Sequence, residues 1–200
     1  MNLPMKISFL FSALGLFITL GAIAANPPDS PDATPASQKS AQPPSDKGDQ
    51  VVTGGDLAFM NDAAPGGLAE VELGRLAVKQ GSTSAVKKFA QRMIVDHSKA
   101  GEALKELARQ KRVNLPATLL PESEQTMEKL SKTSGADFDQ AYVKVMVTMH
   151  EKDVAAFSAV AQNATDADVK AFAAKTLPTL KMHLEMIHAM AEQMGVKVKS

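Results

Sequence analysis

The stretch VKKFAQRMIVDH, residues 86–97, shows the pattern that decides the fold. Its apolar residues recur every three or four positions, which places them on one face of an α-helix. His97 falls within this apolar face, where a polar side chain is unexpected, and Asp96 lies at its edge. Extended along the chain, the face consists of Val86, Phe89, Met93, Ala100, Leu104 and Leu107.

The same helical period continues on both sides of this stretch and predicts four long helices. They cover residues 56–80, 82–111, 137–161 and 166–194, and a shorter helix is expected over 121–132. No segment alternates between apolar and polar residues with the period of a strand. Asp56 is the expected N-cap of the first helix. Pro65 is expected to kink or restart that helix, and Pro178 to kink the last one.

The connections between these helices predict the topology. Short links join the first helix to the second and the third to the fourth, which demands two antiparallel hairpins. The longer middle connection, with its short helix, carries the chain from one hairpin to the other. We therefore expect an all-α domain over residues 55–196, a ferritin-like four-helix bundle of two antiparallel hairpins with a short crossover helix.

The N-terminal quarter of the chain predicts export rather than folding. Lys6 precedes an apolar run over residues 7–23, and Ala22-Ile23-Ala24 fits a signal-peptidase site. We therefore interpret residues 1–25 as a cleavable signal peptide and expect a periplasmic protein with no transmembrane span after cleavage. A retained membrane anchor is the alternative, although this run falls short of the roughly 20 residues that span a bilayer. Residues 26–54, rich in Pro, Ser and Asp, predict a disordered linker.

Composition excludes several classes of function. The formal net charge is zero, which gives no reason to expect a nucleic-acid partner, and Lys87, Lys88, Arg109, Lys111 and Arg112 fit solvated helix surface. The chain has no cysteine, so disulfides, thiolate metal sites and thiol nucleophiles are excluded. No phosphate-binding loop and no serine-nucleophile or zinc-protease motif is present. An enzymatic function therefore stays open but ranks third, behind metal binding and a structural interaction module.

Five titratable side chains interrupt the apolar faces of the four long helices. His150 and Asp153 lie one turn apart on the third of these helices, so their side chains can converge. All five lie near the middle of their helices, which puts them at a similar level in an antiparallel bundle. By contrast, Glu72 and His188 fall on polar outer faces. The candidate metal ligands are Glu70, His97, His150, Asp153 and His183.

Two explanations of this polar layer remain open. Several imidazoles and carboxyls are costly to bury unless they pair with each other or share a cation. A shared cation would be a transition metal, iron or zinc before copper or manganese. A diiron site is disfavoured, because neither His97 nor His183 has a Glu three residues before it. Methionines at 182, 186, 190 and 194 fit core packing better than a copper site.

Four motifs resemble a family of exported bacterial proteins, the domain of unknown function 4142, which is often described as a predicted outer membrane protein. They are AEVELGRLA (69–77), the stretch 86–97 quoted above, HEKD (150–153) and LPTLKMHL (177–184). The resemblance covers residues 56–194 and implies a ferritin-like bundle in the periplasm. It adds Glu72 as a secondary site candidate, and it implies no established activity.

The sequence thus predicts a periplasmic helical protein that binds a transition metal in its core, with a link to envelope stress. The alternative is a non-catalytic interaction module that binds other envelope proteins and whose buried polar layer is structural. In that case the polar layer would only set the register of the helices.

Overall fold

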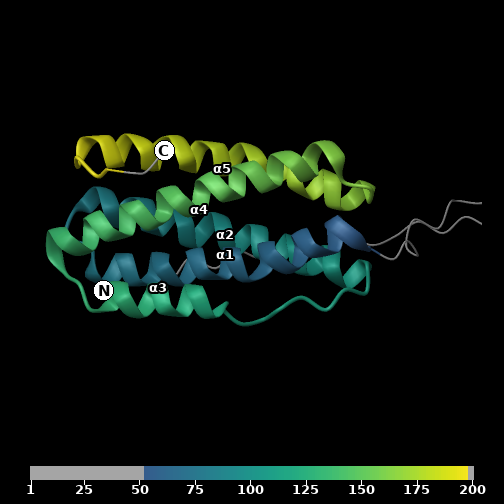
Figure 1. Ribbon diagram of the computed structural model, residues 1–200, viewed down its shortest axis with the longest axis horizontal. Coiled ribbons are helices and arrows are strands. Elements are labelled where there is room, and N and C mark those ends of the chain that lie inside the picture. The colour runs from purple at the N-terminus through teal and green to yellow at the C-terminus, as the bar shows by residue number, and fades with distance from the viewer. Residues whose placement is uncertain (1–51, 198–200) are drawn as a thin grey trace, which may run out of the picture. The chain divides into compact units, whose positions relative to one another are not determined.

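The computed structural model describes residues 52–197, and in this range the chain forms five helices and no strand (Figure 1). The prediction of an all-α fold is confirmed. The predicted signal peptide and most of the predicted linker lie outside the described residues. The helices are α1 (Gly54–Gln80), α2 (Ser84–Gln110), α3 (Pro121–Ser131), α4 (Gly135–Asn163) and α5 (Ala167–Gln193).

The four long helices form two hairpins, as their short connections predict. Helix α1 packs mainly against α2, and α4 packs mainly against α5. Contacts of α1 with α4 and of α2 with α5 join the hairpins into one bundle. After α2 the chain runs back along the bundle, and α3 packs on the outside against α1 and α4 (Figure 1). None of the helices between residues 52 and 197 combines the length and apolar character that a membrane crossing requires.

The first helix begins earlier than the sequence predicts and continues through Pro65. The helix begins at Gly54, directly after Thr53. Val52, which the composition placed in the predicted linker, is buried in the core. The N-cap prediction for Asp56 is wrong. Its carboxylate instead accepts a hydrogen bond of 2.7 Å from the backbone N–H of Asp166, next to the start of α5.

The junction of α2 and α5 contains a buried cation, and the prediction that Lys111 lies on a solvated surface is therefore wrong. The Lys111 ammonium is 8% exposed and lies 2.8 Å from a carboxylate oxygen of Asp166 and 2.8 Å from one of Asp168. Two opposite charges compensate for its desolvation, which is the condition under which a charged group is buried.

A second carboxylate links the two hairpins at the other end of the bundle. Asp139 lies near the start of α4. It is fully buried, and it accepts hydrogen bonds from the backbone N–H groups of Ser82 and Thr83 and from the Ser82 hydroxyl. These groups precede the first turn of α2, so Asp139 satisfies donors that the second helix leaves unpaired.

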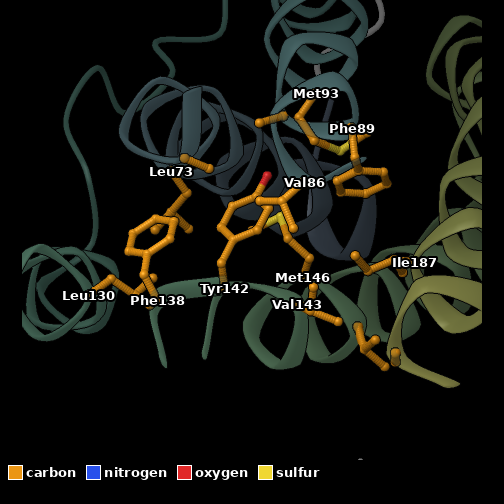
Figure 2. Packing of buried hydrophobic residues seen from close by; sticks show 14 residues of the cluster. Leu73, Val86, Phe89, Met93, Leu130, Phe138, Tyr142, Val143, Met146 and Ile187 are labelled. Atoms are coloured by element: carbon orange, nitrogen blue, oxygen red, sulfur yellow. The ribbon is translucent and has the colours of Figure 1, made fainter. Parts of the chain in front are cut away.

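The apolar core consists of two clusters separated along the bundle axis. The first packs Phe89 of α2, Tyr142 and Met146 of α4 and Ile187 of α5, and Leu130 of α3 closes its edge beside Phe138 (Figure 2). The second lies toward the start of α1 and α5. Between the two clusters, each of the four long helices places a polar side chain in the interior. The second cluster includes Phe59, Met60, Leu104, Phe157, Val169 and Leu180.

Candidate metal centre

Three imidazoles from three different helices meet between the two apolar clusters. His97 of α2, His150 of α4 and His183 of α5 are 6%, 0% and 0% exposed. Their ring centroids lie 5.4 to 5.5 Å apart in every pairing. One ring nitrogen from each residue lies within 4.8 Å of the corresponding nitrogens of the other two. We call these three residues the histidine triad.

Hydrogen bonds determine which nitrogen of two triad rings carries the proton. Nδ1 of His150 lies 3.0 Å from the carbonyl oxygen of Met146, one turn earlier in α4. A carbonyl oxygen only accepts, so Nδ1 is protonated and Nε2 keeps its lone pair. Nε2 of His183 lies 2.9 Å from a carboxylate oxygen of Asp96 in α2. Nε2 is therefore the donor in His183, and its lone pair is on Nδ1.

Glu70 of α1 supplies the corresponding contact for the third ring. Its Oε2 lies 2.7 Å from Nδ1 of His97, and its Oε1 lies 3.3 Å from Nδ1 of His150. Both are contacts of ion-pair type between a carboxylate and an imidazole. A carboxylate at this distance favours the proton on Nδ1 of His97 and leaves Nε2 with the lone pair.

The three remaining nitrogens have no partner. Within residues 52–197, Nε2 of His97, Nε2 of His150 and Nδ1 of His183 are all buried without a hydrogen-bond partner. Imidazoles that bind a metal usually donate their other N–H to a carboxylate or a backbone carbonyl. His150 and His183 do so here, and Nδ1 of His97 faces the Glu70 carboxylate. Each ring therefore keeps one lone pair without a partner, and one nitrogen of each ring lies close enough to the others for the three rings to share an ion. Two nitrogens bound to one ion at 2.0–2.1 Å would be roughly 3.4 Å apart, so small ring movements would close the site.

Asp153 lies at the edge of the centre rather than among the imidazoles. Its half-buried carboxyl interacts with that of Glu70. A cavity of about 30 Å³ adjoins both carboxyls and the ring of His97. Asp153 is therefore linked to the triad by its interaction with Glu70 and by the cavity that it lines together with His97.

The interior shifts the acid–base equilibria of all five groups towards their neutral forms. Burial raises the pKa of Glu70 to about 7, although the charge of His150 opposes the shift. Burial and the neighbouring charge of Glu70 raise the pKa of Asp153 to about 8. Burial also lowers the pKa of each triad imidazole. At neutral pH the rings are therefore unprotonated, which is the form that binds metals.

These shifts predict how the stability of the metal-free protein depends on pH. Below about pH 6.5 the unfolded chain binds more protons at the triad than the folded protein, so stability falls with acidification. Between about pH 4 and pH 7–8 the folded protein holds more protons on Glu70 and Asp153 than the unfolded chain does. The stability that these two protonated carboxyls contribute is therefore lost as the pH rises. The free energy of unfolding should therefore be greatest near pH 6.5. Urea titrations from pH 5 to 9 measure it, and a flat profile would contradict this account.

The structure brings together most of the residues that the sequence singled out. The triad and Glu70 are in contact, and Asp153 reaches them through Glu70. Sequence reasoning missed Asp96 as part of the site, although it placed this residue at the edge of the apolar face. His188 and Glu72 lie outside the centre. His188 is paired with Glu151 at 3.3 Å, and Glu72 with Arg75 at 2.9 Å.

A family assignment agrees with this architecture. The sequence pattern of the family DUF4142, described as a domain of unknown function, matches residues 40–190. The chain belongs to this family. The resemblance identified from the sequence motifs is thereby confirmed, and no curated protein matches the chain.

Several solved structures share this fold. A DUF305 fragment from Deinococcus radiodurans is 12% identical, covers 72% of this chain and 99% of its own, and superposes with a TM-score of 0.64. A predicted secreted DUF305 protein from Streptomyces coelicolor is 13% identical, with coverages of 73% and 97% and a TM-score of 0.63. CopM in its Cu(I)-bound form is 15% identical, with coverages of 69% and 96% and a TM-score of 0.59. At these identities the likeness concerns the fold alone.

Proposed function

We propose that this DUF4142 protein is an exported helical protein that binds one copper ion through His97, His150 and His183. The observation that carries the proposal is the set of three buried, unpartnered ring nitrogens, one from each of three helices. Each ring is oriented through its other nitrogen by Glu70, by the Met146 carbonyl or by Asp96. Glu70 and Asp96 then act as orienting groups rather than as ligands.

Copper suits this centre better than the iron or zinc favoured by residue types alone. Three neutral imidazoles supply no anionic ligand to the ion, and Cu²⁺ binds nitrogen ligands more tightly than the other divalent ions of its row. Glu70 and Asp153 lie next to the triad. Ionisation of both carboxyls would balance the two charges of Cu(II), and ionisation of one of them would balance the single charge of Cu(I). CopM, which has the same fold, has been described with Cu(I) and with Cu(II).

The cellular setting is part of the same proposal. The predicted signal peptide places the mature chain in the periplasm, where a copper-binding bundle would sequester the ion or pass it on. A role in envelope stress and contact with other envelope proteins would follow from that location.

Metal loading of the untagged protein tests the proposal. Purified protein is equilibrated separately with Cu(II), Zn(II) and Fe(II), and with Cu(I) under exclusion of oxygen, and bound metal is measured after gel filtration. We expect one copper per chain in at least one oxidation state, and we expect copper to displace zinc. Absence of stoichiometric copper in both states would overturn the proposal.

The alternative, a purely structural polar layer, is favoured by the close contact of Glu70 and His97 at 2.7 Å. In that case the carboxyls and imidazoles satisfy one another without an ion and set the register of the helices. Substitutions in the layer would then change stability alone. The loading experiment distinguishes the two cases, because only a true copper site binds one copper ion per chain.

A further inference from the structure

Two cavities meet at the polar layer. The larger one, about 710 Å³, is a groove between α1 and α2, bounded on its outer side by residues 113–117. The smaller one is the cavity of about 30 Å³ beside Glu70 and Asp153. His97, Gly67 and Gly101 line both cavities. These three residues therefore lie between the surface groove and the interior of the bundle.

His97 is the triad ring that this groove reaches. It keeps 6% of its surface exposed, whereas His150 and His183 are fully enclosed. An ion that enters from the groove would therefore meet His97 first. Neither His150 nor His183 lines the groove or the inner cavity.

The two glycines keep the boundary between the cavities thin. Gly67 belongs to α1 and Gly101 to α2, so they face the groove from opposite sides. A Cβ atom built on either one meets no atom of the described chain within 4 Å. Any longer side chain at these positions would occupy the space between groove and cavity.

The inner cavity is also suited to a cation. Two carboxyls, Glu70 and Asp153, line it, and the 1% exposed Glu70 lies 2.7 Å from Nδ1 of His97. On the rim of the groove, by contrast, Glu72 pairs with Arg75 and Glu102 pairs with Lys105. The carboxyls at the inner end of the path are paired with neither Lys nor Arg in these contacts, and Glu70 faces the imidazoles of the triad.

We propose that the groove between α1 and α2 is the path by which the metal ion enters and leaves, passing between Gly67 and Gly101. This inference rests on the proposed copper site and adds its route of exchange. The competing route lies at the opposite edge of the triad, where Asp96 is partly exposed beside His183.

Substitutions that fill the gap test the path. Gly67→Leu and Gly101→Leu place a side chain between groove and cavity, and leucine favours a helix more than glycine does. Gly66→Leu is the matched control, since its Cβ also meets open space and Gly66 lines neither cavity. The probe is Cu(II) alone, added in a stopped-flow instrument.

The fluorescence of Tyr142 provides the signal for copper uptake. Tyr142 is the only tyrosine, and the chain has no tryptophan. One aromatic ring separates it from the triad, because Phe89 lies 6.4 Å from Tyr142 and 6.4 Å from His183 between ring centroids. Bound Cu(II) should therefore quench its fluorescence, and the rate of quenching follows uptake.

We expect both gap variants to take up and release Cu(II) at least about tenfold more slowly, because the ion must await a local opening of the bundle. Their equilibrium affinity should match that of the parent, since a blocked path slows both directions equally. Gly66→Leu should exchange copper at the parent rate. Unchanged rates in both gap variants would overturn the path and assign exchange to the Asp96 edge, while the copper site itself would stand. A parent protein that binds no copper would overturn the site and the path together.

Discussion

Replacement of His183 by alanine is expected to abolish stoichiometric copper binding and to lower the affinity more than about hundredfold. Substitution of a residue that merely orients a ligand already costs 10- to 100-fold, so removal of a ligand should cost more. His183 is fully enclosed, and its Nδ1 is one of the three unpartnered nitrogens. Without it, the other two rings form at most a two-coordinate site.

The fourth histidine of the chain provides a matched control. His188 lies in the same helix, is exposed, and pairs with Glu151 rather than with the triad. His188→Ala should therefore bind copper as the parent does. Competition against a copper chelator of known affinity measures both variants. Equal affinities for His183→Ala and His188→Ala would contradict the triad as the copper site.

The Asp96→Ala variant, measured in the same experiment, distinguishes a residue that orients a ligand from a residue that binds the ion. The Asp96 carboxylate accepts the Nε2 hydrogen of His183 at 2.9 Å and so keeps the lone pair on Nδ1. Asp96→Ala leaves all three imidazoles in place, and we expect it to lower the affinity about 10- to 100-fold. This smaller loss is what distinguishes an orienting carboxylate from a ligand.

Much of this centre could be predicted from helical periodicity, and the part that could not depends on how the helices pack. Glu70, His97, His150 and His183 fall on buried faces because the bundle buries one stripe of every helix. Asp96 lies at the boundary of its stripe. Its role depends on where α5 crosses α2, which the pattern of a single helix does not contain.

The incorrect predictions have the same origin. Asp56 has the residue type and position of an N-cap, and Lys111 has those of a solvated helix end. Both instead contact Asp166, more than fifty residues away in the chain, because the ends of three helices meet there. Local propensity identifies the helices, whereas long-range contacts decide what the polar residues at their ends bind.

The affinity for Cu(II) should rise steeply with pH because binding displaces protons from two carboxyls. With a pKa of about 7 for Glu70 and about 8 for Asp153, both groups are protonated in the metal-free protein below pH 7. A divalent cation next to them favours their ionised forms. Each proton released changes the affinity about tenfold per pH unit, so we expect about a hundredfold change per unit below pH 7. The dependence should weaken to about tenfold between pH 7 and 8 and vanish above pH 8.

Glu70→Gln tests the origin of this dependence. The amide can keep the polar contact with Nδ1 of His97, but the group no longer ionises, so the slope below pH 7 should fall from two protons to one. Asp153→Asn should have the same effect on the slope. Glu72→Gln is the matched control, because Glu72 pairs with Arg75 outside the centre, and it should keep the parent slope. Chelator competition at two pH values below 7, and again at pH 7.5 and 8.5, measures all four proteins. A parent slope unchanged by Glu70→Gln and by Asp153→Asn would show that the protons come from other groups.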